Sequence, residues 1–210
     1  MVPLKVEHRR VEKVVEFISS HADVATLSLD VDALLSELRF GVDADDFEAA
    51  FDKLGKALGF ACERPDKQWK AGPDNHWVLR DDASLLVECK SEVGLHRAEI
   101  EKRETDQINR AYAWFTKTYP NVQPQCVMII PSKKLARGAG VLQSTYALND
   151  NGLKKLRTNV QAFFGEFHSQ DLKNLSKQNV QEALERHRLG VEDLLSHYSV
   201  PIKDAGSPRN

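Results

Sequence analysis

The spacing of apolar residues changes along this chain from helical to alternating and back, and this change restricts the fold more than any other feature. Apolar side chains recur at helical spacing over about 6–38 and again over 47–58. Between Phe60 and Val93 they alternate with polar side chains, as in strands, and helical spacing returns over 99–118. A helix, several strands and a further helix in this order predict an α/β unit.

The strands of this unit can be placed from apolar runs and turn residues. We expect a meander of three strands at 60–64, 76–80 and 84–91. A wholly apolar segment at 125–130 follows the helix, and strands that are apolar on both faces are usually central in a sheet. With a short strand at 145–148 and a helix at 149–167, the order predicts a central mixed β-sheet flanked by helices.

The chain of 210 residues is long enough for one well-buried domain with helical additions. We expect a helical N-terminal extension at 1–42 and the α/β core at 43–167. After the core, a polar helical hairpin is expected at 168–202 and a disordered tail at 203–210.

Charge and composition exclude several classes of protein. The net charge of −2 excludes a polybasic protein that binds nucleic acid through its overall field. The three cysteines, Cys62, Cys89 and Cys126, have no C-x-x-C spacing, which argues against a disulfide framework and a structural zinc site. No apolar run approaches the roughly 20 residues of a membrane helix, and the first residues lack an apolar signal segment. We therefore expect a cytoplasmic protein without a membrane partner.

Two short segments carry the candidate chemistry, Gly72-Pro-Asp74 and Glu88-Cys-Lys90. Side chains alternate along a strand, so Glu88 and Lys90 should project from one face and Cys89 from the other. An antiparallel neighbour can bring Asp74, at its turn, close to Glu88. We therefore expect two carboxylates and a lysine in one place. The sequence suggests no Ser-His-Asp or Cys-His arrangement and no phosphate-binding loop.

An acidic pair with a lysine suits metal-assisted hydrolysis. Two neighbouring carboxylates repel each other, and a divalent cation usually relieves the repulsion. Hard oxygen ligands favour Mg²⁺ or Mn²⁺ over zinc. A lysine beside the cation can orient a water and offset the charge that grows on a phosphate. The set therefore predicts attack of water on a phosphodiester.

Asp74 followed by Glu88-x-Lys90, between two helices, resembles the PD-(D/E)xK nuclease superfamily. The same segments also look like the nuclease-type domain at the C-terminal end of some bacterial DEAD/DEAH-type helicases. The resemblance spans about 46–167 and implies a restriction-endonuclease-like core and a Mg²⁺- or Mn²⁺-dependent nuclease that acts on DNA. It further implies that Asp74, Glu88 and the carbonyl of Cys89 bind the metal, and that Lys90 handles the water.

The resemblance also implies supporting residues and partners. An acid on the first helix maps onto Glu48, and a glutamine on the later helix maps onto Gln107, while Glu63 is a further candidate acid. The basic residues of one loop are candidates for contacts with phosphates: Lys133, Lys134 and Arg137. A homodimer or a larger helicase-type or phage-defence assembly is expected, and RNA stays open as a substrate.

Simpler interpretations remain open at each position. Glu88 and Lys90 also fit a surface ion pair on an edge strand, and Asp74 also fits an ordinary turn. Glu48, Gln107 and the basic loop also fit solvated surfaces. The alternative function is a nuclease fold without catalysis that serves as a nucleic-acid-binding or protein-docking module.

Overall fold

The structure is a computed structural model that describes residues 3–203, so the expected tail lies, except for Lys203, outside the described residues. Its centre is a six-stranded sheet with the strands side by side in sequence order. The strands are β1 (Ala61–Glu63), β2 (Asn75–Arg80), β3 (Ala83–Cys89), β4 (Gln123–Ile129), β5 (Thr145–Leu148) and β6 (Val200–Pro201). β1 to β3 pair antiparallel, β3 to β5 pair parallel, and β6 is antiparallel to β5. The predicted α/β fold with a mixed sheet is confirmed.

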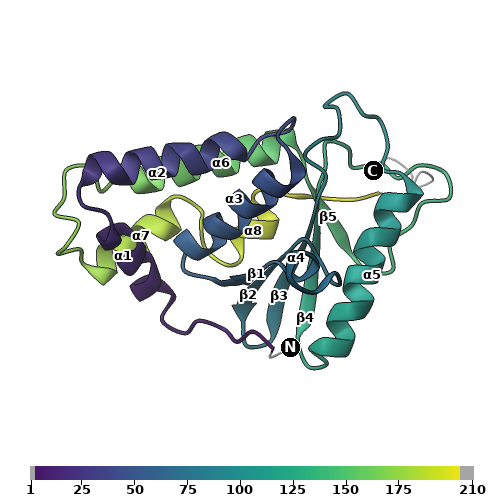
Figure 1. Cartoon of the computed structure of the whole chain (residues 1–210), viewed down its shortest axis with the longest axis horizontal. Helices are drawn as coiled ribbons and strands as arrows, with labels where there is room; N and C mark the ends of the chain where they lie inside the picture. Colours follow the sequence, from purple (N-terminus) through teal and green to yellow (C-terminus); the bar gives the residue numbers. More distant parts are fainter. Residues whose placement is uncertain (1–2, 204–210) are drawn as a thin grey trace.

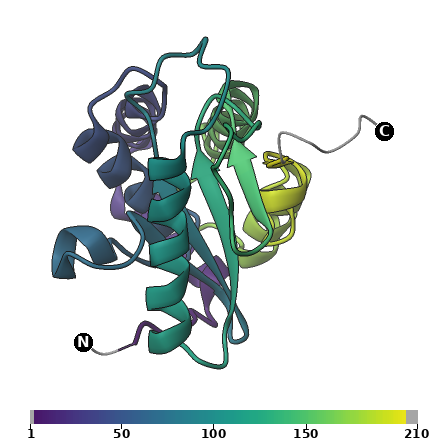
Figure 2. The same cartoon turned by 90° about the vertical axis from the view of Figure 1, so that its right-hand side faces the viewer.

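Helices flank the sheet on both faces (Figure 1). One face is covered by α1 (Arg10–Ser20), α2 (Val24–Glu37), α3 (Ala44–Ala57), α6 (Asp150–Gly165), α7 (Lys177–Arg186) and α8 (Asp193–Ser196). The other face is covered by α5 (Lys102–Thr118), which lies in front of the strands in Figure 2. The short α4 (Pro65–Trp69) leads into β2 beside α5.

The side chains of β3 divide between these two layers. Leu85 and Val87 belong to the large apolar cluster formed with α1 to α3 and α6. Leu86 belongs to a smaller cluster with Ile108 and Phe115 of α5. This alternation follows from the pleat of a strand, and it directs the even-numbered residues of β3 toward α5.

The N-terminal helices are part of the core. Their buried residues Val14, Ile18 and Leu27 share one cluster with α3 and the sheet. The guanidinium of Arg10 donates hydrogen bonds to the carbonyls of Leu58 and Leu189, at 2.9 and 2.7 Å. Within its described residues, the segment predicted as an extension at 1–42 contains α1 and α2, whose apolar side chains complete the domain.

Two segments differ from the sequence-based expectation. Helix α4 lies between the strands expected at 60–64 and 76–80, where no helix was expected, and Pro65 occupies its first position, where a proline is tolerated. The hairpin expected at 168–202 contains only the short helices α7 and α8 and then β6. Arg188 takes a left-handed conformation (φ 56°) just after α7, which ends that helix early. Within residues 3–203, no helix has the length and apolar character to cross a membrane.

Candidate active site

The turn that carries Asp74 depends on Gly72. Gly72 has φ of +93°, and a Cβ at this position would lie 2.8 Å from the ring of Trp114 on α5. Glycine avoids both the strained conformation and the collision. The turn brings the Oδ2 atom of Asp74 within 2.7 Å of the backbone N–H of Cys89, which donates a hydrogen bond to it. The Asp74 carboxylate is thereby held against the end of β3.

Glu88 and Lys90 lie at the same end of β3, on the face toward α5. The Nζ atom of Lys90 is 3.5 Å from Oε2 of Glu88 and 3.9 Å from Oδ2 of Asp74. It also donates a hydrogen bond of 3.1 Å to the carbonyl of Cys89. Glu88 is buried, whereas a surface ion pair would leave it exposed. The structure thus brings Asp74, Glu88 and Lys90 together, with the ammonium in contact with both carboxylates.

Burial and mutual repulsion dominate the electrostatics of this cluster. Burial raises the pKa of Glu88 well above its ordinary value, and the negative charge of Asp74 raises it further. Burial also raises the pKa of Asp74. Burial alone would lower the pKa of Lys90, but the charges of Glu88 and Asp74 outweigh it and raise the pKa. The raised pKa values mean that both carboxyls bind a proton, and Lys90 keeps its proton, more readily than in water. The cluster therefore favours positive charge.

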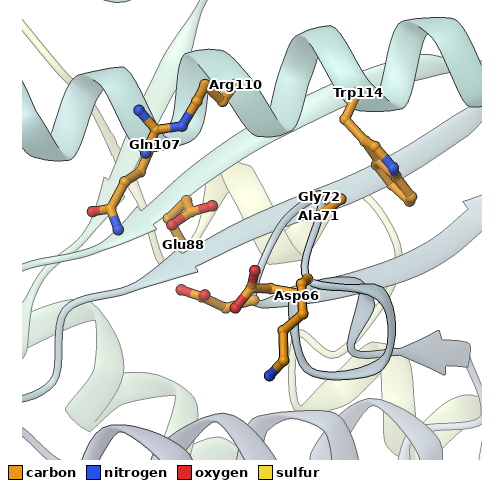
Figure 3. Close-up of a pocket in the computed structure, with 9 residues that line it drawn as sticks. Asp66, Ala71, Gly72, Glu88, Gln107, Arg110 and Trp114 are labelled. Carbon is orange, nitrogen blue, oxygen red and sulfur yellow. The ribbon is translucent and has the colours of Figure 1, made fainter.

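The cluster lies at a pocket of about 300 Å³ between α4, β3 and α5 (Figure 3). Its lining residues are Asp66, Lys70, Ala71, Gly72, Asp74, Glu88, Gln107, Arg110 and Trp114. A second hollow of about 470 Å³ shares Gln107 and Arg110 with it and reaches Lys90. Because the two hollows share residues of α5, we call them together the path along α5; Asp74 and Glu88 line its first part and Lys90 its second.

Helix α5 supplies one wall of this path. Arg103, Gln107, Arg110 and Trp114 follow each other at intervals of four, three and four residues, so they lie on one face of the helix. Figure 3 shows Glu88 between the side chains of this helix and Asp66 of α4. Gln107, expected from the sequence, is therefore placed at the pocket.

Glu48 is close to the cluster but faces a different partner. Its carboxylate accepts a hydrogen bond from Arg64 at 2.7 Å, and it is not among the pocket-lining residues. Burial raises its pKa, and the charge of Asp74 contributes to the same shift. Glu48 therefore influences Asp74 through its charge, while Arg64 holds its side chain away from the pocket.

The other sequence candidates lie elsewhere. Lys133, Lys134 and Arg137 are exposed on the loop after β4, where Lys134 pairs with Glu99 at 2.5 Å, and none of them lines the pocket.

Glu63 is buried in β1, where it accepts hydrogen bonds from His76 (2.8 Å) and Tyr119 (3.0 Å). The Nε2 atom of His76 is 3.0 Å from the hydroxyl of Ser84. This Ser-His-Glu row, absent from the sequence-based expectations, depends on the register of three strands. Ser84 is only 1% exposed and rings of Phe115 and Tyr119 pack against His76, so the row is a sealed polar link within the sheet.

Five residues that line the pocket were not expected from the sequence: Asp66, Lys70, Ala71, Arg110 and Trp114. Asp66 lies in α4 and Lys70 directly follows it, in a stretch where no helix was expected. Arg110 and Trp114 lie at helical spacing from Gln107, and that spacing is the signal that could have found them. The negative charge of Asp66 also contributes to the raised pKa of Asp74.

The oxygen atoms around Lys90 fit a hard divalent cation. The carboxylates of Asp74 and Glu88 and the carbonyl of Cys89 all contact its ammonium. Mg²⁺ is commonly held by one or two carboxylates, with water or phosphate oxygens completing its shell. Among residues 3–203, no group of three or more His, Cys, Asp or Glu side chains could hold a metal. A site here would therefore depend on oxygens from water or substrate.

Comparison of the chain with known proteins finds no matching family model, no matching curated protein and no matching solved structure. The geometry of the site itself is therefore the basis for assigning a function to this chain.

Proposed function

We propose that this protein is a metal-dependent nuclease of the PD-(D/E)xK type that hydrolyses phosphodiester bonds in DNA. The observation that carries the proposal is the contact of one lysine ammonium with two partly or fully buried carboxylates beside an open, polar pocket. Buried charges that repel each other destabilise a fold, so such a cluster favours a functional explanation. The order of helices and strands around it agrees with the proposal.

The roles follow from the positions of the side chains. Asp74, Glu88 and the Cys89 carbonyl would hold Mg²⁺ or Mn²⁺, which activates a bound water and polarises the phosphate. Lys90 would orient the attacking water and offset negative charge on the phosphate, because its ammonium contacts both carboxylates and its side chain lines the path along α5. Gln107 faces the same path and can hold a water or a phosphate oxygen.

The proposal also covers where the protein acts and what brings DNA to its site. The three cysteines are free thiols, which agrees with a reducing cytoplasm. A helicase-type or phage-defence assembly would bring the substrate to the site. The loop with Lys133, Lys134 and Arg137 would contact DNA farther from the pocket.

The test is a cleavage assay with plasmid and single-stranded DNA in Mg²⁺, Mn²⁺ or EDTA. Asp74→Asn, Glu88→Gln and Lys90→Met preserve size and should each reduce cleavage by about a hundredfold or more. Glu182→Gln and Lys155→Met change an exposed acid and an exposed lysine far from the pocket and should retain activity. Circular dichroism checks that each variant is folded.

Cleavage that persists in EDTA or in all three site variants would refute the nuclease assignment. DNA binding without cleavage in either metal would instead favour the non-catalytic binding module.

A further inference from the structure

We propose that the pocket holds an unpaired nucleic-acid strand, with a base stacked on the Trp69–Trp114 pair and the adjoining phosphates bound by Lys70 and Arg110. The inference deepens the proposed nuclease function by assigning its substrate class. It is nevertheless testable without cleavage, since it concerns binding alone.

The aromatic pair lies at the edge of the candidate site. The rings of Trp69 and Trp114 are nearly parallel, with an angle of 24° and centroids 6.4 Å apart. Trp114 lines the pocket together with Asp74 and Glu88, and Trp69, at the end of α4, stacks on Trp114. Trp69 is 39% exposed, which is unusual for the largest apolar side chain. Stacking between a base and an aromatic ring contributes a factor of roughly 5 to 150 to affinity.

The two cations beside this pair have no carboxylate partner among the described residues. Neither Lys70 nor Arg110 forms an ion pair within residues 3–203, whereas the nearby Arg64 and Lys67 both pair with Asp45. Unpaired cations next to two carboxylates and Asp66 offset the negative charge of the pocket. A nucleotide supplies a partner for each, since cations bind its phosphate and an aromatic platform stacks on its base.

Lys70 is also held in an uncommon conformation. It ends α4 with φ 56° and ψ 33°, in the left-handed region that lysine rarely adopts. Trp69 and Lys70 therefore lie at the junction between α4 and the Gly72 turn that leads to Asp74. Backbone strain of this kind is common at binding sites.

The geometry favours an unpaired strand over a duplex. Bases in a duplex are stacked on each other, and reaching a protein ring requires a base to leave the stack. A pocket of about 300 Å³ matches a small-molecule site and accommodates about one nucleotide. The row from Trp114 to Arg103 along α5 would guide the neighbouring phosphates past Glu88.

The experiment measures binding of the full chain to fluorescein-labelled 12-mers in EDTA, where metal-dependent cleavage is absent. Three probes of the same sequence are compared: single-stranded DNA, single-stranded RNA and blunt duplex DNA. Fluorescence anisotropy gives the affinity, and quenching of tryptophan emission reports stacking directly. We expect the single strands to bind at least about fivefold more tightly than the duplex and to quench the emission.

Variants then separate stacking from charge. Trp69→Ala should weaken single-strand binding by about fivefold or more and remove most of the quenching, while Trp69→Phe should keep most of the affinity. Arg110→Gln should weaken binding and reduce its salt dependence. Leu142→Ala removes another exposed apolar side chain and Lys155→Gln another exposed cation, and both should bind like the wild type.

Equal binding of duplex and single strands, or unchanged binding and quenching by Trp69→Ala, would overturn the inference. Single-strand binding with the expected variant effects, but no cleavage in Mg²⁺ or Mn²⁺, would support the inference and refute only the nuclease assignment. Similar affinities for DNA and RNA single strands would support an unpaired strand of either chemistry.

Discussion

Glu88 links the chemistry of the site to the stability of the fold, because its carboxylate is buried beside Asp74. A buried acid whose pKa is raised in the folded state binds its proton more tightly there than in the unfolded chain. The folded protein therefore loses stability as pH rises from the ordinary value of 4.5 toward the raised one. Above pH 4.5, without metal, the buried carboxyl of Glu88 therefore costs the folded protein stability.

We therefore predict that Glu88→Gln stabilises the metal-free protein at pH 8, because glutamine resembles the protonated acid. The melting temperature should rise by about 2–4 °C, the change that roughly 1 kcal/mol produces in a chain of this size. The difference should shrink toward pH 4.5. Thermal unfolding in EDTA, followed by circular dichroism at pH 5 and pH 8, measures it. A variant that is equally destabilised at both pH values would contradict the pKa argument.

The sequence predicted which residues meet at this site better than it predicted their surroundings. Alternation along β3 places Glu88 and Lys90 on one face, and the strand order brings Asp74 to them. Burial of Glu88 depends on α5 and α4 packing over the strand end, which no local pattern specifies. The link from Glu63 to Ser84 likewise requires the register of three strands.

At the scale of elements, α4 is the part that local patterns describe least well. It has five residues, and helices of this length depend on their surroundings more than on propensity. Its position is set by the packing of Pro65 and Trp114 around Gly72. The long helix after the meander was predicted more readily, because Ile108, Ala111 and Phe115 of α5 recur at helical spacing on its buried side.

The left-handed C-cap of α4 gives a prediction about stability. Lys70→Gly should stabilise the protein by about 0.5–1 kcal/mol, since glycine adopts φ 56° without steric strain. The same change should weaken binding of single-stranded DNA, because it removes a cation from the pocket. Urea denaturation and anisotropy measure the two effects. Lys67→Gly, inside α4, is the matched control and should destabilise the protein.

At the scale of the whole molecule, the helices that precede the nuclease-like region complete its core. Helix α1 crosses the end of α3 so closely that a Cβ at Gly59 would lie 2.3 Å from the carbonyl of Arg10. The apolar periodicity of the first 42 residues predicted helices, but not the surface against which they pack. That surface is formed by α3, α6 and α7, which come later in the chain.

Removing residues 1–42 should therefore abolish cooperative folding, although every candidate site residue is retained. Exposure of the apolar faces of α3 and α6 should give strong binding of a hydrophobic dye and no sharp thermal transition. A truncated chain that melts sharply would show that the later residues form an independent domain.

Gly59→Ala is a milder test of the contact between α1 and the end of α3. It should lower the free energy of unfolding by about 2–4 kcal/mol, because the φ of +81° at Gly59 and the carbonyl of Arg10 both disfavour a side chain.

The ammonium of Lys90 is a positive charge that the protein itself supplies to the two carboxylates. On the proposed assignment, a divalent cation must exchange with this ammonium for the same oxygen atoms, so the measured metal affinity is the difference between two competing ions. Lys90→Met should then bind Mn²⁺ more tightly than the wild type in calorimetry, while remaining unable to cleave. The ammonium of Lys90 would thus set a minimum concentration of free metal, below which the site binds no metal and cleaves no substrate.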